Sequence, residues 1–254
     1  MNKMNDTVID GEISQELEDD YIIEDVGDVQ FNGTKSKSRV KENGEVFTPN
    51  KTVCDMMDLL KEEGYRVESK VLEPSCGNGN FLVEILKRKT QEVYQRYLNS
   101  NNDIDVYNLN LAIAVSNIYG VDIMPDNISE AQSRLRNGTA TDNEHIGYVE
   151  QYKIHTGEDI PDWLDKTLMF IIKTNIQLGN MLTGEKLYAR GKVAYSDPDD
   201  NHLLVSEWNF NGSRVKRVDY YMNNIDMVAQ DGYREVDYAR LSKQKYLGVK
   251  ELDC

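Results

Sequence analysis

A pair of glycines between a short apolar strand and an apolar helix carries the clearest chemistry in the sequence. Val71 and Leu72 end a predicted buried strand, and the segment Glu73-Pro74-Ser75-Cys76-Gly77-Asn78-Gly79-Asn80-Phe81-Leu82 follows. The two glycines let backbone N–H groups approach a ligand closely, and the N-terminus of the next helix points at the same place. This layout is typical of a nucleoside-cofactor site, although an ordinary strand–turn–helix connection has the same outline.

An acidic residue ends the next predicted strand, Ile118-Tyr119-Gly120-Val121-Asp122-Ile123. In doubly wound sheets a carboxylate at this point accepts hydrogen bonds from the ribose hydroxyls of a nucleoside, so Asp122 is the candidate acceptor. Between the glycine turn and this strand, helices are predicted over residues 80–99 and 109–117. Further helices are predicted over residues 53–60 and 163–173. In the helix over 53–60, the spacing of Met56, Met57, Leu59 and Leu60 predicts core positions.

Three segments together resemble one family. Glu45-Val46-Phe47-Thr48-Pro49 precedes a predicted helix, Glu73 to Phe81 forms the glycine turn, and Tyr119 to Arg134 contains the strand that ends in Asp122. In this order they resemble the N6-adenine DNA methyltransferases of restriction–modification systems, which use S-adenosylmethionine. A fourth segment, Asn175-Ile176-Gln177-Leu178-Gly179-Asn180-Met181-Leu182, resembles the family's third motif, with Asn180 where the family has an acid.

The resemblance covers residues 44–182 and implies a cofactor, S-adenosyl-L-methionine, with DNA as the substrate. The side chain of Asn180 would accept a hydrogen bond from the cofactor's adenine amine without carrying a charge. The residues that the resemblance places around the cofactor are Phe47, Thr48, Pro49, Glu73, Pro74, Cys76, Gly77, Gly79, Phe81, Asp122, Ile123 and Asn180.

The catalytic loop of the family is missing from this sequence. The family transfers the methyl group with an Asp/Asn-Pro-Pro-Tyr/Phe loop that binds the amine of a flipped adenine and stacks on the base. The nearest string, Asp197-Pro198-Asp199-Asp200, lacks the aromatic residue and the second proline and is more simply a polar turn. The catalytic residues are therefore unknown. Two interpretations stay open: a methyltransferase subunit that needs a companion methyltransferase or specificity subunit, and an inactive pseudo-methyltransferase with an interaction, regulatory or anti-restriction role.

The expected fold is α/β, a Rossmann-like methyltransferase domain with a mostly parallel sheet. Apolar runs on either side of Asn211-Gly212-Ser213 predict a C-terminal antiparallel hairpin, which we expect to supply the sheet's final two strands. The domain is expected to be incomplete because little chain remains for further strands. The predicted division is an acidic tail and basic linker over residues 1–43 and the methyltransferase-like domain over residues 44–254.

The formal charge of −15 is unevenly distributed. Residues 1–30 contain ten acids and one lysine, a net −9, which leaves −6 for the other 224 residues. We expect this tail to be disordered and either solubilising or an acidic arm that mimics nucleic acid or docks on a basic partner. A DNA-binding surface needs positive charge, and the chain offers only a linker with Lys35 and Arg39 and a hairpin group of Arg214, Lys216 and Arg217.

Other residue types point to a cytoplasmic protein without a metal. No run of about 18 apolar residues is present, and the N-terminus does not resemble a signal peptide. The three cysteines, Cys54, Cys76 and Cys254, have no metal-ligand spacing, and their odd number suits a reducing compartment. The three histidines at positions 145, 155 and 202 share no ligand pattern.

Overall fold

The computed structural model describes residues 35, 39–41, 45–60, 62–139, 146–190, 193–196, 201–222, 224–230 and 235–243. The predicted tail over residues 1–30 and the string Asp197-Pro198-Asp199-Asp200 lie outside these ranges. The helices are α2 (Asn50–Asp58), α3 (Asn80–Asn99), α4 (Ile104–Ser116), α5 (Pro125–Asn137), α6 (Tyr148–Thr156) and α7 (Asp162–Asn175), with 3-10 turns η1 (Glu62–Tyr65) and η2 (Tyr238–Lys243). The strands are β1 (Val71–Glu73), β2 (Ile118–Asp122), β3 (Ile176–Asn180), β4 (Glu185–Arg190), β5 (Val193–Ser196), β6 (Leu204–Asn211), β7 (Arg214–Tyr221), β8 (Asn224–Gln230) and β9 (Val236–Asp237).

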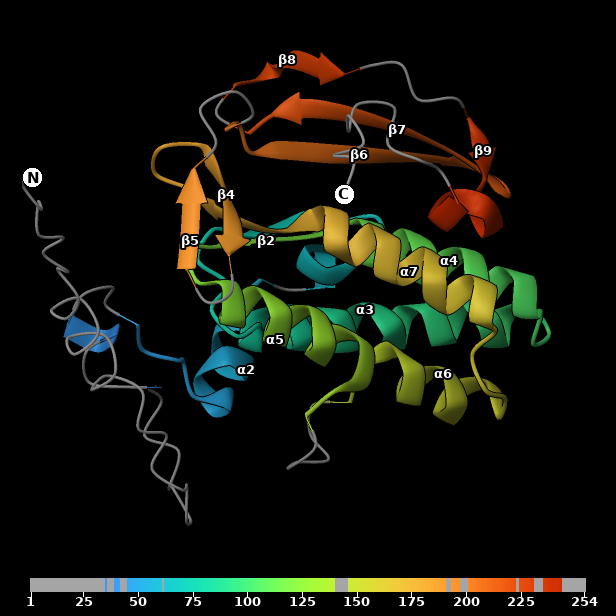
Figure 1. The fold of residues 1–254 in the computed structure, drawn as a ribbon. Coiled ribbons are helices and arrows are strands. Elements are labelled where there is room, and N and C mark those ends of the chain that lie inside the picture. Colours follow the sequence, from blue (N-terminus) through green and yellow to red (C-terminus); the bar gives the residue numbers. More distant parts are fainter. Residues whose placement is uncertain are drawn as a thin grey trace, which may run out of the picture.

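The first sheet has the order β1-β2-β3-β4-β5. Its first three strands are parallel, with Val71 opposite Ile118 and Gly120 opposite Ile176. Helices α3 and α4 connect β1 to β2, and α5, α6 and α7 connect β2 to β3, so the predicted βαβ organisation is present. Strands β4 and β5 then return antiparallel, at the left of the molecule in Figure 1.

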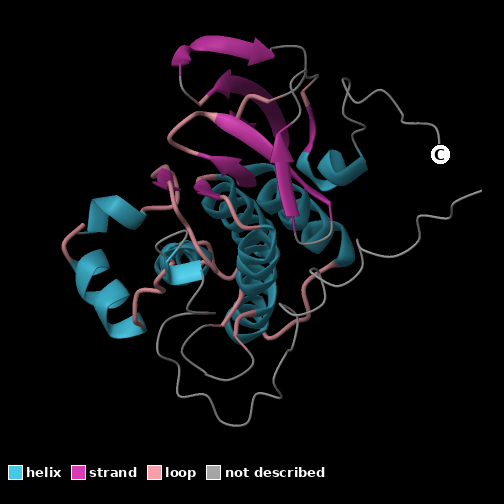
Figure 2. Cartoon of the chain, turned by 60° about the vertical axis from the view of Figure 1, so that its left-hand side comes forward, coloured by secondary structure: helices cyan, strands magenta, loops and turns pink. Residues whose placement is uncertain are grey.

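The predicted hairpin forms, but it does not extend this sheet. Strands β6 and β7 pair antiparallel, with Asn211 opposite Arg214 across the turn, and join β8 and β9 in a second sheet. This sheet lies above α4 and α7 (Figures 1 and 2). Because β4 already occupies the edge of β3, the hairpin packs by its side chains instead. The Tyr119 hydroxyl donates to the Ser206 carbonyl at 2.8 Å, and Trp208 Nε1 donates to Asn175 Oδ1 at 3.0 Å.

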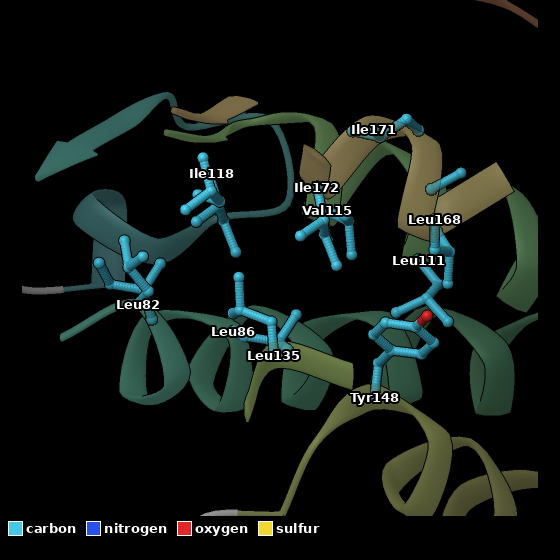
Figure 3. Close-up of a cluster of buried hydrophobic side chains, with 14 of the residues drawn as sticks. Leu82, Leu86, Leu111, Val115, Ile118, Leu135, Tyr148, Leu168, Ile171 and Ile172 are labelled. Atoms are coloured by element: carbon cyan, nitrogen blue, oxygen red, sulfur yellow. The ribbon is translucent and has the colours of Figure 1, made fainter. Parts of the chain in front are cut away.

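One continuous apolar core holds these elements together. Figure 3 shows Leu82 and Leu86 of α3 facing Ile118 of β2, and α4 and α7 meeting through Val115 and Ile172. Aliphatic side chains of this size each contribute about 1.5–3 kcal/mol when fully buried. The core extends to Trp208 and Val215 of the second sheet, so both sheets share it.

Helix α2 exposes more apolar surface than its sequence predicts. Met57 is buried, whereas Met56, Leu59 and Leu60 are 49%, 80% and 48% exposed, so the prediction of four core residues is wrong for three of them. The helix ends at Asp58, and only Val53 and Met57, one turn apart, face α3. None of the helices in the described ranges is long and apolar enough to cross a membrane.

Candidate cofactor-binding site

The glycine turn and the acid of the second strand meet at the carboxyl edge of the parallel strands. Because β1 and β2 are neighbours, the residues that follow them come together there. The Gly77 N–H donates to Asp122 Oδ2 at 2.9 Å, and the Cys76 N–H donates to the Val121 carbonyl at 2.9 Å. Gly77 has a φ of +52°, and a Cβ there would lie 3.2 Å from the Phe47 ring, so the turn requires glycine.

Asp122 is buried and held in one orientation by its own chain. Its Oδ1 accepts hydrogen bonds from the Met124 N–H at 2.8 Å and from Asn127 Nδ2 at 3.2 Å, while Oδ2 accepts from Gly77. A carboxylate offers about four lone-pair sites, so one position of Asp122 stays available to a ligand.

The segment around Phe47 is tied to the same turn. The buried Phe47 ring lies against Gly77, and the Thr48 carbonyl accepts a hydrogen bond of 2.9 Å from Asn80 Nδ2. Pro49 precedes α2, and its carbonyl accepts the first backbone hydrogen bond of that helix, from Val53. Segments about 30 residues apart in sequence thus form one wall of the site.

A small pocket of about 120 Å³ opens between these groups. Four of the residues named from the sequence line it, and five others complete the lining: Phe47, Gly77, Asp122 and Ile123, with Glu45, Val46, Ser75, Met124 and Asn127. Pockets for whole cofactors measure roughly 300–1,000 Å³, so this pocket has room for only part of a ligand of that size.

Five more of the residues named from the sequence belong to the segment of the glycine turn but do not line this pocket. Glu73 ends β1, and burial raises the pKa of its carboxyl group. Pro74 is exposed, while Phe81 packs against the core at the start of α3. A Cβ on Gly79 would lie 3.0 Å from Ala131 Cβ, so this glycine lets α3 approach α5. Burial, with the nearby charges of Asp122 and Glu73, raises the pKa of the Cys76 thiol and so disfavours the thiolate form that a nucleophile needs.

Asn180 lies apart from the pocket, at the carboxyl end of β3. Its Oδ1 accepts a hydrogen bond of 3.0 Å from the Leu182 N–H and closes the turn toward β4. A wider hollow of about 620 Å³ opens between α5, β3 and β4 and includes Asp126, Gln132, Leu178 and Tyr188 in its lining.

Of the five lining residues that were not named from the sequence, two are joined to each other by a side-chain hydrogen bond. Asn127, in the first turn of α5, donates from Nδ2 to both Asp122 Oδ1 and Glu45 Oε1, at 3.2 and 2.7 Å. Glu45 also accepts from Arg39 Nη2 at 2.5 Å. The signals were proximity alone, since Glu45 adjoins the Phe47 motif and Asn127 follows Asp122 by five positions.

Two cations of the predicted linker reach this site. Lys35 Nζ lies 2.8 Å from Glu130 and 2.8 Å from Asn127 Oδ1, and 5.7 Å from the centre of the Phe47 ring. Arg39 pairs with Asp126 at 2.6 Å, and these cations hold the pKa of the Asp126 carboxyl at about 2 against the opposing effect of burial.

The basic group of the hairpin is divided between the surface and the interior. Arg217 is buried and pairs with Asp219 at 2.6 Å, while Arg214 pairs with Glu235 at 3.0 Å. Alternating strand faces place Arg217 inward, opposite Trp208. Within the described ranges, no group of three or more His, Cys, Asp or Glu side chains has the arrangement of a metal site.

On its outer side β1 pairs with no strand of the described part of the chain. The sheet order ends at β1, and Leu72 in its centre is 41% exposed, whereas Tyr119, its register partner on β2, is buried. The Val71 N–H donates toward β2, to the Asn117 carbonyl, so the peptide groups of Leu72 face outward. The carboxyl end of this open edge leads into the glycine turn.

Comparisons with known proteins agree with this geometry. The family model of the N-6 DNA methylases matches residues 29–156, half of the chain. A protein of Methanocaldococcus jannaschii described as "Putative type II restriction enzyme and methyltransferase" is 30% identical over 141 residues, which cover 52% of this chain. The match spans only 11% of that relative's length. No solved structure matches the chain. The chain belongs to the N-6 DNA methylase family.

Proposed function

We propose that this chain binds S-adenosyl-L-methionine and forms the cofactor-binding part of an adenine-N6 DNA methyltransferase of a restriction–modification system. The observation that carries the proposal is the junction of Gly77 with Asp122 beside Phe47, at the carboxyl ends of two parallel strands. Ligands of open α/β sheets bind in this position. The family supports S-adenosylmethionine as the methyl donor.

Each side chain of the site has a role in this proposal. Asp122 accepts a hydrogen bond from a ribose hydroxyl, and Phe47 and Ile123 supply apolar walls. The N-terminus of α3, which follows the glycine turn, attracts the cofactor's carboxylate. The side-chain oxygen Oδ1 of Asn180 keeps one lone pair beyond the hydrogen bond that it accepts from the Leu182 N–H, and it would accept a second from the adenine amine.

A companion chain would supply the catalytic half. In doubly wound sheets the ligand crevice lies where the strand order reverses, beside the first strand. Here the order ends at the open edge of β1. We infer that a companion methyltransferase or specificity subunit pairs with this edge and contributes the loop that binds the target amine and stacks on the base. The net charge of −15 is a further reason to assign most DNA contacts to the companion. The reaction would take place in the cytoplasm.

A second candidate is an inactive pseudo-methyltransferase that regulates or inhibits a restriction system. The observation that favours it is the absence of any Asp/Asn-Pro-Pro-aromatic string from the sequence, together with the acidic tail. An acidic arm can occupy a basic DNA-binding surface by charge complementarity.

A methyl-transfer assay separates the candidates. The chain, alone and with a companion that carries an Asn-Pro-Pro-Tyr loop, is incubated with duplex DNA and S-adenosylmethionine labelled on its methyl group. We expect no transfer by the chain alone and transfer by the complex, lost when Asp122 is changed to Ala. Inhibition of the companion's own methylation would support the regulatory role instead. Transfer by the isolated chain, lost in Asp197→Ala or Asp199→Ala, would contradict the need for a companion.

A further inference from the structure

Glu45 carries a buried oxygen, beside the candidate cofactor-binding pocket, that has no partner among the described residues. Its side chain is 8% exposed, and the residue lines the pocket with Phe47, Gly77 and Asp122. Oε1 accepts hydrogen bonds from Arg39 Nη2 and Asn127 Nδ2, whereas Oε2 has no hydrogen-bond partner in the part of the chain that the structure describes.

An unpaired carboxylate oxygen at this depth calls for a donor. Burying a charged group without a hydrogen bond is costly, and the cost per unpaired group is about 1–3 kcal/mol or more for charged ones. Charged acceptors also form the shorter and stronger class of hydrogen bond. Since Glu45 lines the pocket, a ligand in that pocket is placed to provide the donor.

The neighbouring acceptor identifies the kind of donor. Asn127 Nδ2 contacts both Glu45 Oε1 and Asp122 Oδ1, so the two carboxylates lie side by side on one pocket wall. Neither can donate when ionised. The ligand group between them must therefore present two adjacent donors, as the two hydroxyls of a ribose do.

We propose that Glu45 binds the cofactor, with Oε2 accepting a hydrogen bond from one ribose hydroxyl while Asp122 accepts from the other. This inference rests on the proposed function, since it takes the ligand to be a ribonucleoside. It makes Glu45 a specificity-determining residue that selects ribonucleosides over deoxynucleosides. Arg39, which pairs with Glu45, reduces the repulsion between the two carboxylates.

The supporting contacts fix Glu45 in place. Arg39 and Asn127 hold Oε1 from two directions, which leaves Oε2 as the oxygen for the ligand. The buried Phe47, two residues along the chain, anchors the segment against Gly77. The site is therefore preorganised, which reduces the entropy lost on binding.

Equilibrium binding of S-adenosylhomocysteine, adenosine, 2′-deoxyadenosine and 3′-deoxyadenosine to the full chain tests the proposal. Glu45→Gln keeps the side-chain size and an acceptor for Arg39 and Asn127 but places an amide nitrogen at the free position. We expect it to bind S-adenosylhomocysteine and adenosine about 10- to 100-fold more weakly. It should bind one of the two deoxyadenosines as well as the wild type does, because that ligand lacks the hydroxyl that Glu45 binds.

Arg39→Gln is the matched control. It removes the same ion pair, between residues 39 and 45, but leaves Oε2 of Glu45 unchanged, so a smaller loss of affinity is expected. Thermal melting checks that both variants fold. A wild-type chain that binds none of the ligands would overturn the proposed function, and with it this role of Glu45. A wild type that binds, with Glu45→Gln unchanged, would overturn the role of Glu45 alone. Loss for S-adenosylhomocysteine but not for adenosine would show that Glu45 binds the amino-acid part instead, and would also overturn the ribose assignment.

Discussion

The Gly77 N–H donates a hydrogen bond of 2.9 Å to Asp122 Oδ2, joining the turn after β1 to the end of β2. These residues are 45 positions apart in sequence. The bond fixes both the backbone that approaches a ligand and the carboxylate that would bind it. A substitution that removes this bond at the end of one strand should therefore also disturb the group at the end of the other strand.

Gly79→Ala should destabilise the fold through both strain and packing. Its φ is +91°, and a Cβ would lie 3.0 Å from Ala131 Cβ and 3.1 Å from Ala131 Cα, so α3 and α5 would have to separate. Strain of this kind costs about 1–3 kcal/mol. Gly157→Ala is the matched control, because its φ is +77° but its Cβ would meet nothing within 4 Å. Urea unfolding should show a larger loss in the free energy of unfolding for Gly79→Ala than for Gly157→Ala. Equal losses in the two variants would contradict the close approach of α3 and α5.

Lys89 should make the stability depend on pH. The side chain is fully buried on α3, and its ammonium donates to the carbonyls of Arg66 at 2.6 Å and Ser69 at 2.5 Å. Burial lowers its pKa to about 8, from an ordinary value of 10.5. Between these values the unfolded chain binds the extra proton, so the free energy of unfolding should rise with pH across this window.

Lys89→Met should remove that rise and destabilise the protein at neutral pH. The carbonyl oxygens before β1 would lose their donor, at a cost of about 1–3 kcal/mol. Urea unfolding of both proteins at about pH 7.5 and about pH 9.5 measures the two effects. The same pH dependence in both proteins would show that another group is responsible.

Cys76 should resist alkylation in the folded protein. Burial and the charges of Asp122 and Glu73 raise the pKa of its thiol, and only the thiolate reacts. The pKa of the Cys54 thiol is raised as well, but Cys54 is partly exposed, so an alkylating reagent reaches it more easily than it reaches Cys76. Peptide mass spectrometry after brief iodoacetamide treatment at about pH 8 should show Cys54 modified first, and Cys76 only after denaturation. Equal rates would mean that the glycine turn opens readily.

Deleting residues 1–30 should raise DNA affinity, or weaken binding to a basic partner, mainly at low salt. The segment has a net charge of −9, and screening at 0.1 M salt limits its reach to about 10 Å. A variant with the ten acids changed to Asn or Gln separates charge from length. Fluorescence anisotropy with duplex DNA at about 50 mM and about 300 mM salt is the measurement. Identical curves for all three proteins would leave the tail with a solubilising role.

Local signals predicted the elements around the site closely. The helix predicted over 80–99 matches α3, and the strand predicted over 118–123 matches β2 to within one residue, because the glycine turn and the apolar run mark their ends. Helix α4 begins at Ile104 rather than near residue 109, since the Asp103 side chain caps it by accepting from the Asp105 N–H. The hairpin turn was also predicted, from Asn211-Gly212-Ser213.

Long-range features could not be predicted from the sequence in the same way. The attachment of the hairpin depends on contacts such as Trp208 with Asn175, 33 residues apart. The place of Glu45 depends on Asn127, which is 82 residues away and lies on a helix that the sequence reading did not predict. The absent catalytic loop, in contrast, was evident from the sequence alone.

Calorimetric titration of the purified chain with S-adenosylmethionine tests the central claim most directly. Wild type and Asp159→Ala, a control at an exposed acid outside the pocket, should bind. Asp122→Ala removes the ribose acceptor and the partner of Gly77, and should lose about 1.5–3 kcal/mol of affinity, with circular dichroism confirming that it is folded. Absence of binding by the wild type at millimolar ligand would contradict the account and leave the glycine turn as an inherited scaffold.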